Sequence, residues 1–231
     1  YDFGGADTQL GGDGDDSILN TQNIVDSADS ILGGAGNDQI YSGASGRDTV
    51  LGGAGHDSVL GSGGNDSIIE VDGDGAGNDT LSGGEGADWI EAALGNDSIF
   101  DFSHADTILA GDGNDTVLFD AADQLVDGGS GINVLKINDA SVDLTTINNA
   151  LLTNIQVIDL ANSAASTLAL AEADVTALLP SGSTTLYVKG DANDRVVFRE
   201  AWDVNRTATV DGIQYQVFAR NGLNVYAQVG L

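Results

Sequence analysis

Cysteine and methionine are both absent from this sequence of 231 residues, and proline occurs once. Without cysteine, neither a disulfide nor a thiolate metal site can form. Runs of about 18 apolar residues, which a membrane-spanning helix requires, are also missing, so we expect no membrane span. The first residues do not have the pattern of a signal peptide. Because the chain opens inside a repeat, we expect it to be the end of a longer polypeptide.

Basic residues are scarce as well. Seven lysines and arginines face 36 aspartates and glutamates, which gives a formal net charge of −29. Residues 1–133 hold 26 acids and only Arg47 as a cation, a net charge of −25, whereas residues 134–231 hold 10 acids and 6 cations, a net charge of −4. With no basic face, the chain is not expected to bind nucleic acid. Self-repulsion on this scale opposes compaction unless cations bind.

What the sequence does have is a repeat of nine residues, clearest between Leu32 and Leu60. The template is G-G-x-G-x-D-x-U-x, where U is a large aliphatic residue. Glycines at the first, second and fourth places are expected to allow positive φ and to bring backbone carbonyls inward. The aspartate at the sixth place supplies an anionic oxygen, and the aliphatic at the eighth place points into a core, as in a short strand. Oxygen ligands in a tight turn suit calcium better than zinc or copper.

The template recurs along residues 1–133 and identifies the candidate metal ligands. The sixth place is held by Asp16, Asp38, Asp48, Asp57, Asp66, Asp79, Asp88, Asp97, Asp106 and Asp115. The paired glycines at the second and fourth places are Gly12, Gly14, Gly34, Gly36, Gly53, Gly55, Gly84, Gly86, Gly111 and Gly113. The eighth place is always a branched aliphatic: Ile18, Ile40, Val50, Val59, Ile68, Leu81, Ile90, Ile99, Ile108 and Val117. A preference of aspartate for turns does not explain this phase with both glycine and an inward aliphatic.

The register slips at a few turns. Residues 42–47 carry one extra residue, and residues 70–73 insert four. The turns that end at Asp29 and Asp106 contain no glycine, so we expect them to be the weakest metal sites. At Asn133 the aspartate has become asparagine, and the repeats stop there.

This pattern resembles the nonapeptide repeats of RTX (repeats-in-toxin) proteins. The resemblance implies an all-β fold, a right-handed parallel β-roll solenoid in which two nonapeptides form one coil. It also implies several calcium ions, each held between turns that stack on the same edge. We therefore assign residues 1–133 to a calcium-binding β-roll.

Residues 134–231 follow a different pattern. Alternation predicts strands over 155–160, 186–188, 195–198, 213–219 and 223–229, and the Asn-Gly at 221–222 predicts a hairpin between the last two. Residues 170–179 predict a short helix that begins at Ala171 without a side-chain cap and ends before Pro180. Because a solenoid needs its exposed end covered, we expect this β-rich region with one helix to cap the roll.

The order of these segments resembles the C-terminal region of giant RTX adhesins that are exported by type I secretion. That resemblance implies a secreted or cell-surface protein, an uncleaved export signal in residues 134–231, and the type I machinery and the rest of an adhesin chain as partners. The expected function is a non-enzymatic module that folds on reaching extracellular calcium and contributes to cell adhesion and biofilm formation.

Two alternatives stay open on the residues. The repeats alone fit the tail of a secreted protease or lipase equally well. A surface-binding or ice-binding roll is disfavoured because the third place has no row of threonines. His56 and His104 lack partners at zinc-ligand spacing, and no HExxH or G-x-S-x-G motif is present. We therefore expect no catalytic residues in this chain.

Side chains at the seventh and ninth places are expected to face outward. Trp89 holds the seventh place, and the ninth is often apolar: Leu19, Tyr41, Leu51, Leu60, Ile69, Phe100, Leu109 and Leu118. Two interpretations are possible: partial burial under neighbouring turns, or an apolar stripe that contacts another domain or chain.

Overall fold

The computed structural model describes residues 6–20, 28–71, 77–100, 104–138, 141–160 and 165–228. The opening of the chain (1–5), the turn positions 25–27, 72–76 and 101–103, and residue 229 of the last predicted strand lie outside the described residues. The chain forms two compact units, residues 1–131 and 132–231. In the described part of the chain, no helix is both long and apolar enough to cross a membrane.

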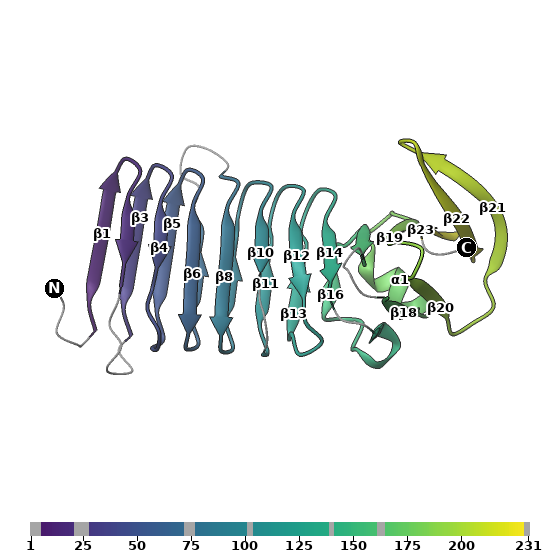
Figure 1. Ribbon diagram of the computed structural model, residues 1–231, viewed down its shortest axis with the longest axis horizontal. Coiled ribbons are helices and arrows are strands. Elements are labelled where there is room, and N and C mark those ends of the chain that lie inside the picture. The colour runs from purple at the N-terminus through teal and green to yellow at the C-terminus, as the bar shows by residue number, and fades with distance from the viewer. Residues whose placement is uncertain are drawn as a thin grey trace. The chain divides into compact units, whose positions relative to one another are not determined.

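The first unit is a stack of short parallel strands that alternate between two sheets (Figure 1). Neighbouring strands of one sheet are two apart in the chain, so each coil contributes one strand to each sheet. One sheet contains β1 (Thr8–Asp13), β3 (Ser30–Ala35), β5 (Thr49–Ala54), β7 (Ser67–Ile69), β9 (Trp89–Glu91), β11 (Thr107–Leu109) and β13 (Leu125–Asp127). The other contains β2 (Ser17–Leu19), β4 (Gln39–Tyr41), β6 (Ser58–Gly63), β8 (Thr80–Glu85), β10 (Ser98–Phe100) and β12 (Thr116–Phe119). The predicted parallel β-solenoid is confirmed.

The register of these sheets follows the nine-residue template. Val50 pairs with Ile68, and Ile68 pairs with Ile90, so eighth-place aliphatics stack directly on one another. From Ile40 to Val117 every predicted core residue is at most 3% exposed, and only Ile18, in the outermost coil, is partly exposed. Burying such a side chain is worth about 1.5–3 kcal/mol. The core is therefore a column of branched aliphatics.

Outward positions behave more variably. Trp89 is 43% exposed, as its seventh-place position predicts. At the ninth place, Leu19 and Leu60 are exposed and Leu118 is buried, while Tyr41, Leu51, Ile69, Phe100 and Leu109 are half-buried. Partial burial under neighbouring turns thus accounts for most of the stripe.

The glycines of the template have two different tasks. Those at the second and fourth places have positive φ, for example +121° at Gly34 and +131° at Gly36. The expectation of positive φ is wrong for the first place, because Gly33 and Gly61 are not among the positive-φ glycines. There a Cβ would overlap the aspartate carboxylate of the same repeat and the carbonyl of the next coil. Close approach of oxygens, and not backbone conformation, requires glycine at the first place.

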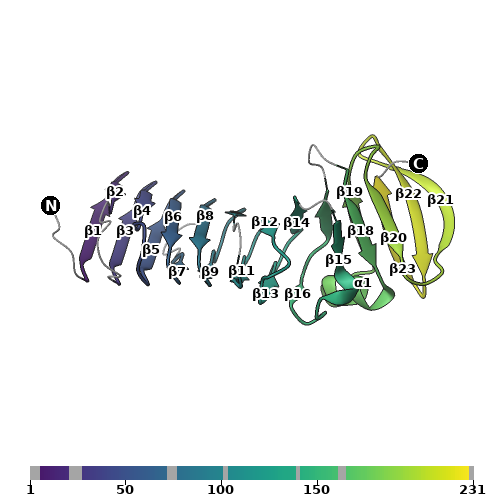
Figure 2. The same ribbon diagram turned by 60° about the horizontal axis from the view of Figure 1, so that its bottom comes forward.

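The second unit contains parallel strands, an antiparallel group and one helix (Figure 2). Strands β14 (Val134–Ile137), β17 (Val157–Asp159), β19 (Thr185–Lys189) and β23 (Leu223–Gln228) are parallel, and β22 (Ile213–Arg220) and β21 (Asp203–Val210) continue the sheet antiparallel. A second sheet contains β15 (Ser141–Asp143), β18 (Thr167–Leu170) and β20 (Arg195–Phe198). A 3₁₀ turn, η1 (Leu144–Thr146), follows β15, and β16 (Leu152–Thr153) lies beside the helix α1 (Glu172–Leu178).

The predicted local elements of this unit are present. Helix α1 begins after Ala171, which has no capping side chain, and the Ala171 backbone N–H donates to the Asp174 carboxylate at 2.6 Å, so one half of a capping box is formed. The Asn-Gly hairpin is confirmed, with positive φ at Asn221 and Gly222. The sequence analysis missed β21 and its Asp-Gly turn at 211–212, where φ is also positive.

Candidate calcium-binding ladders

The sixth-place aspartates stack into two ladders, one along each edge of the first unit. In both ladders the Oδ1 atom of one aspartate accepts the backbone N–H of the aspartate one coil earlier, at 2.7–2.9 Å. The first ladder consists of Asp7, Asp29, Asp48, Asp66, Asp88 and Asp106. The second consists of Asp16, Asp38, Asp57, Asp79, Asp97 and Asp115. All the predicted aspartates are therefore brought together.

The other carboxylate oxygen, Oδ2, points into the stack. From Asp29 to Asp106 and from Asp38 to Asp115, the rungs are at most 4% exposed. The Oδ2 atoms of Asp16, Asp38, Asp66 and Asp88 are buried and have no hydrogen-bond partner in the described structure. A buried carboxylate oxygen is costly unless a donor or a cation compensates it.

The Oδ2 atoms lie close to first-place glycines, and we call the space around such a glycine, together with the oxygens that border it, a cradle. At Gly61, a Cβ would lie 2.7 Å from Asp66 Oδ2 and 2.5 Å from the carbonyl oxygen of Gly83, the first-place glycine of the next coil. The same pair of oxygens, a carboxylate from the repeat itself and a carbonyl from the next coil, surrounds Gly11 and Gly33. Carboxylate and main-chain oxygens from two coils therefore converge at each rung.

The electrostatics of the ladders favour a bound cation. Burial raises the pKa of Asp66 to about 7, partly offset by the N–H of Asp48 and reinforced by the charges of Asp48 and Asp88. Burial likewise raises the pKa of Asp88 and of Asp115 to about 6. These shifts show that the stacked anions are unfavourable without a counter-ion.

The residues present fit calcium. Calcium takes six to eight oxygen ligands, commonly carboxylates and backbone carbonyls, and the cradles at Gly11, Gly33 and Gly61 offer both kinds of oxygen. No group of three histidine, aspartate or glutamate side chains converges among the described residues. The fit therefore depends on main-chain oxygens, such as the first-place glycine carbonyls that lie beside the aspartate Oδ2 atoms at Gly11, Gly33 and Gly61.

Asp29 and Asp106 belong to the first ladder despite their glycine-free turns. Asp29 Oδ1 accepts the N–H of Asp7, and Asp29 Oδ2 accepts a hydrogen bond from the Asn20 side chain at 2.6 Å. That amide contact occupies the oxygen that the other rungs direct into the stack. The ranking of Asp29 as the weakest metal site stays a prediction, and this contact supports it. Asp7 was not predicted as a rung, although the stretch Gly4-Gly5-Ala6-Asp7 matches part of the nine-residue template.

The imidazole of each of the two histidines accepts a hydrogen bond from a backbone N–H of a neighbouring turn. His56 Nδ1 accepts the N–H of Asn78 at 2.7 Å, and the His56 N–H donates to Asn37 Oδ1 at 2.8 Å. His56 is thus one rung of a fifth-place ladder on the surface, which comprises Asp15, Asn37, His56, Asn78, Asn96 and Asn114. His104 Nδ1 accepts the N–H of Gly86 at 3.4 Å. The sequence pattern did not predict this ladder.

Asp123 is a buried acid that the template did not identify. It is 7% exposed, its Oδ2 atom accepts the N–H of Asp120 at 3.1 Å, and its neighbours include Asp106. Burial and the charges of Asp106 and Asp120 raise its pKa to about 7. The template does not identify Asp123 for two reasons. Its turn lacks glycine, and the core residue Val126 follows it one position later than the template requires.

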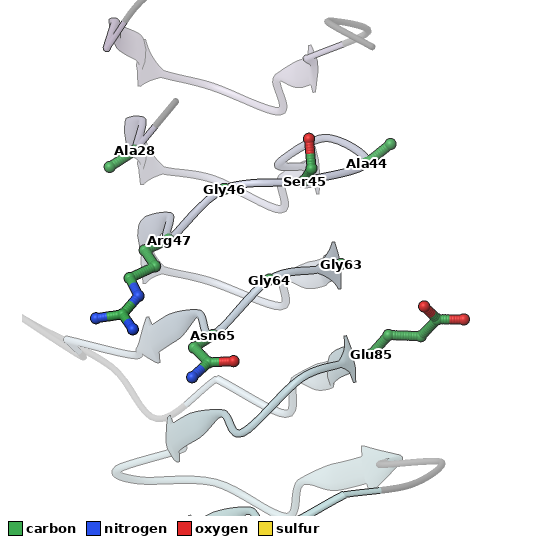
Figure 3. Close-up of a pocket in the computed structure, with 9 residues that line it drawn as sticks. All are labelled: Ala28, Ala44, Ser45, Gly46, Arg47, Gly63, Gly64, Asn65 and Glu85. Carbon is green, nitrogen blue, oxygen red and sulfur yellow. The ribbon is translucent and has the colours of Figure 1, made fainter. Parts of the chain in front are cut away.

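An open hollow of about 590 Å³ lies along three turns beside the first ladder (Figure 3). Its lining comes from the turn with the extra residue (Ala44, Ser45, Gly46, Arg47), together with Ala28, Gly63, Gly64, Asn65 and Glu85. Its polar side chains are those of Ser45, Arg47, Asn65 and Glu85.

Comparison with known families supports the repeat assignment. Residues 26–45, 42–69, 74–99, 83–117 and 102–135 match the family model of the RTX calcium-binding nonapeptide repeat. No curated protein sequence matches the chain. Stacked aspartate ladders within RTX repeats imply calcium binding, and such repeats are typical of secreted proteins.

Proposed function

We propose that this chain is a calcium-dependent folding module at the C-terminal end of a bacterial adhesin that is exported by type I secretion. The two ladders of buried aspartates carry the proposal. Residues 1–133 have a net charge of −25 and a single cation, Arg47, so the side chains of the repeats cannot neutralise the ladders.

The acidic rungs explain how folding depends on the medium. In the cytosol, where calcium is scarce, carboxylate repulsion keeps residues 1–133 expanded and able to pass through an exporter. Outside the cell, affinities of about 10⁻⁴–10⁻³ M suffice to fill extracellular sites. The aspartates and the glycine carbonyls would hold the ions, which supply positive charge between facing oxygens. Ligand that binds only the folded state shifts the equilibrium toward it.

The adhesin and export parts of the proposal rest on the second unit. Its order of strand, helix, strand pair and hairpin is similar to the C-terminal region of RTX adhesins, and its net charge of −4 sets it apart from the repeats. Secretion is further supported by the typical location of RTX repeats. No catalytic role is included in the proposal.

The folding part is tested by circular dichroism during a calcium titration of the purified chain. We expect a cooperative gain of β signal with calcium and little gain with magnesium at equal ionic strength, because magnesium gives up water reluctantly and demands octahedral geometry. A β signal that is unchanged by calcium, or equally induced by magnesium, would contradict it.

The export part needs a separate test. Residues 134–231 fused to a reporter should appear in the medium of a cell that carries a matching type I exporter, whereas the reporter fused to residues 1–133 should stay inside. Retention of the first fusion would contradict the export signal and leave the folding part intact.

A further inference from the structure

Glu70 is a buried glutamate that lies outside the nine-residue template. It follows β7 directly and opens the four-residue insertion at 70–73, yet it is only 3% exposed. Because Ile69 pairs with Leu51, Glu70 falls beside Gly52 of the preceding coil, at the position where a regular repeat would place its own first glycine. A buried carboxylate at this point needs a structural reason.

The Glu70 carboxylate fills the cradle of the repeat that ends at Asp57. The three atoms closest to a Cβ built on Gly52 are Oε2, Oε1 and Cδ of Glu70. At Gly33 and Gly83 the closest atom is instead the Oδ2 of a sixth-place aspartate. Glu70 Oε2 also accepts the N–H of Gly53 at 3.1 Å, which fixes the carboxylate in place.

The insertion explains why a side chain is used here. In a regular stack the cradle also contains the carbonyl oxygen of the first-place glycine one coil later. At Gly61, for example, this is the carbonyl oxygen of Gly83. At Gly52 the two Glu70 oxygens are the closest oxygens, and no carbonyl comes as near. An anionic oxygen pair thus stands where other cradles have a neutral carbonyl. Calcium affinity depends on the charge count of the ligands.

We propose that Glu70 is a calcium ligand, which completes the site of the Gly52–Asp57 repeat in place of a main-chain carbonyl. This inference rests on the proposed calcium-dependent folding. Glu70 and Asp57 are each 3% exposed, and buried anions on two successive coils are compatible with a folded stack when a cation lies between them. The insertion is tolerated because the glutamate keeps the site anionic.

The test compares Glu70→Gln with the wild type and with Glu85→Gln. The control variant removes the same charge from an exposed third-place position. Bound calcium is counted by native mass spectrometry at a free calcium concentration that just saturates the wild type, and folding is followed by circular dichroism in the same titration. We expect Glu70→Gln to hold one ion fewer and to fold at higher calcium, and Glu85→Gln to match the wild type.

The possible outcomes distinguish the role of Glu70 from the calcium-dependent folding on which it rests. A wild type that binds no calcium would contradict the proposed function. A wild type that binds calcium, together with a Glu70→Gln variant of equal ion count and folding midpoint, would overturn only the role of Glu70. If Glu70→Gln does not fold at any calcium concentration, Glu70→Asp decides, since it keeps the charge and withdraws the carboxylate. A ligand role predicts the loss of one ion from Glu70→Asp, and a wild-type count would overturn it.

Discussion

The calcium-free chain should unfold as the pH rises and regain β structure as the pH falls. An unfolded aspartate has a pKa of 3.8, whereas burial in the ladder raises the pKa of Asp66 to about 7 and those of Asp88 and Asp115 to about 6. The folded state therefore binds these protons more tightly than the unfolded state. Below pH 3.8 these carboxyl groups are protonated in both states and their pKa shifts do not affect the free energy of unfolding. Between pH 3.8 and about 7 the shifts lower the free energy of unfolding progressively, and above about pH 7 the loss is complete.

The size of this effect follows from the shifts. At about 1.4 kcal/mol for each pKa unit, Asp66 contributes a cost of about 4 kcal/mol at neutral pH. Asp88 and Asp115 each contribute about 3 kcal/mol, so the three together cost about 10 kcal/mol. A whole domain is typically stable by about 5–15 kcal/mol. The cost of three rungs without a cation is thus comparable to the stability of a whole domain, so we expect the metal-free first unit to be largely unfolded at pH 7.5.

The assay is far-ultraviolet circular dichroism of exhaustively dialysed, metal-free protein between pH 8 and pH 4.5, with hydrogen exchange to locate the change within residues 1–133. We expect little β signal from the repeats at pH 7.5 and a gain between pH 7 and pH 5. With saturating calcium the trend should reverse, because protons then compete with the ion for the same oxygens. A metal-free chain that is equally folded at pH 8 and pH 5 would refute the reasoning.

Three further predictions concern the core, the turns and the second unit. Ile68→Ala removes a fully buried rung of the aliphatic column and should lower the free energy of unfolding in saturating calcium by about 2–5 kcal/mol, measured in urea; a loss below about 0.5 kcal/mol, as expected for a surface change, would contradict the assigned core. Gly113→Ala places a Cβ against the carbonyl of Gly95, whereas the Cβ of Gly14→Ala, also at positive φ, meets nothing within 4 Å. Thermal unfolding in calcium should show a clearly larger loss of stability for Gly113→Ala, and equal losses for the two variants would contradict the close approach. Deletion of residues 134–231 should raise the calcium needed for folding and promote aggregation, followed by dichroism and light scattering; folding at unchanged calcium would argue against a capping role.

The nine-residue period, together with the parallel β-roll that the RTX resemblance implies, was enough to predict the ladders and the core. Asp66 and Ile68 recur in fixed phase, and in a parallel stack a fixed phase places equivalent residues on top of one another. The Asn-Gly hairpin was predictable for a similar reason, since its turn requires positive φ at both residues. Local chemistry determined these features, so the sequence alone revealed them.

Other features depend on contacts between coils and could not be predicted. The first-place glycine is required by the carbonyl of the following coil, which is about two repeats away in the chain. Glu70 lies over Gly52 only because the strands pair in parallel. Strand β21 has little apolar alternation, and the hairpin signal of Asp211-Gly212, which joins it to β22, was not used to predict it. Asp123 is hidden because its turn lacks glycine.

Whether the ladders hold calcium can be seen by anomalous scattering from crystals grown in calcium. We expect calcium peaks between successive coils along both ladders, within coordination distance of the Oδ2 atoms of Asp38, Asp66 and Asp88 and of first-place glycine carbonyls. A folded solenoid whose Oδ2 atoms are contacted by water, with no anomalous peak along either ladder, would contradict this expectation.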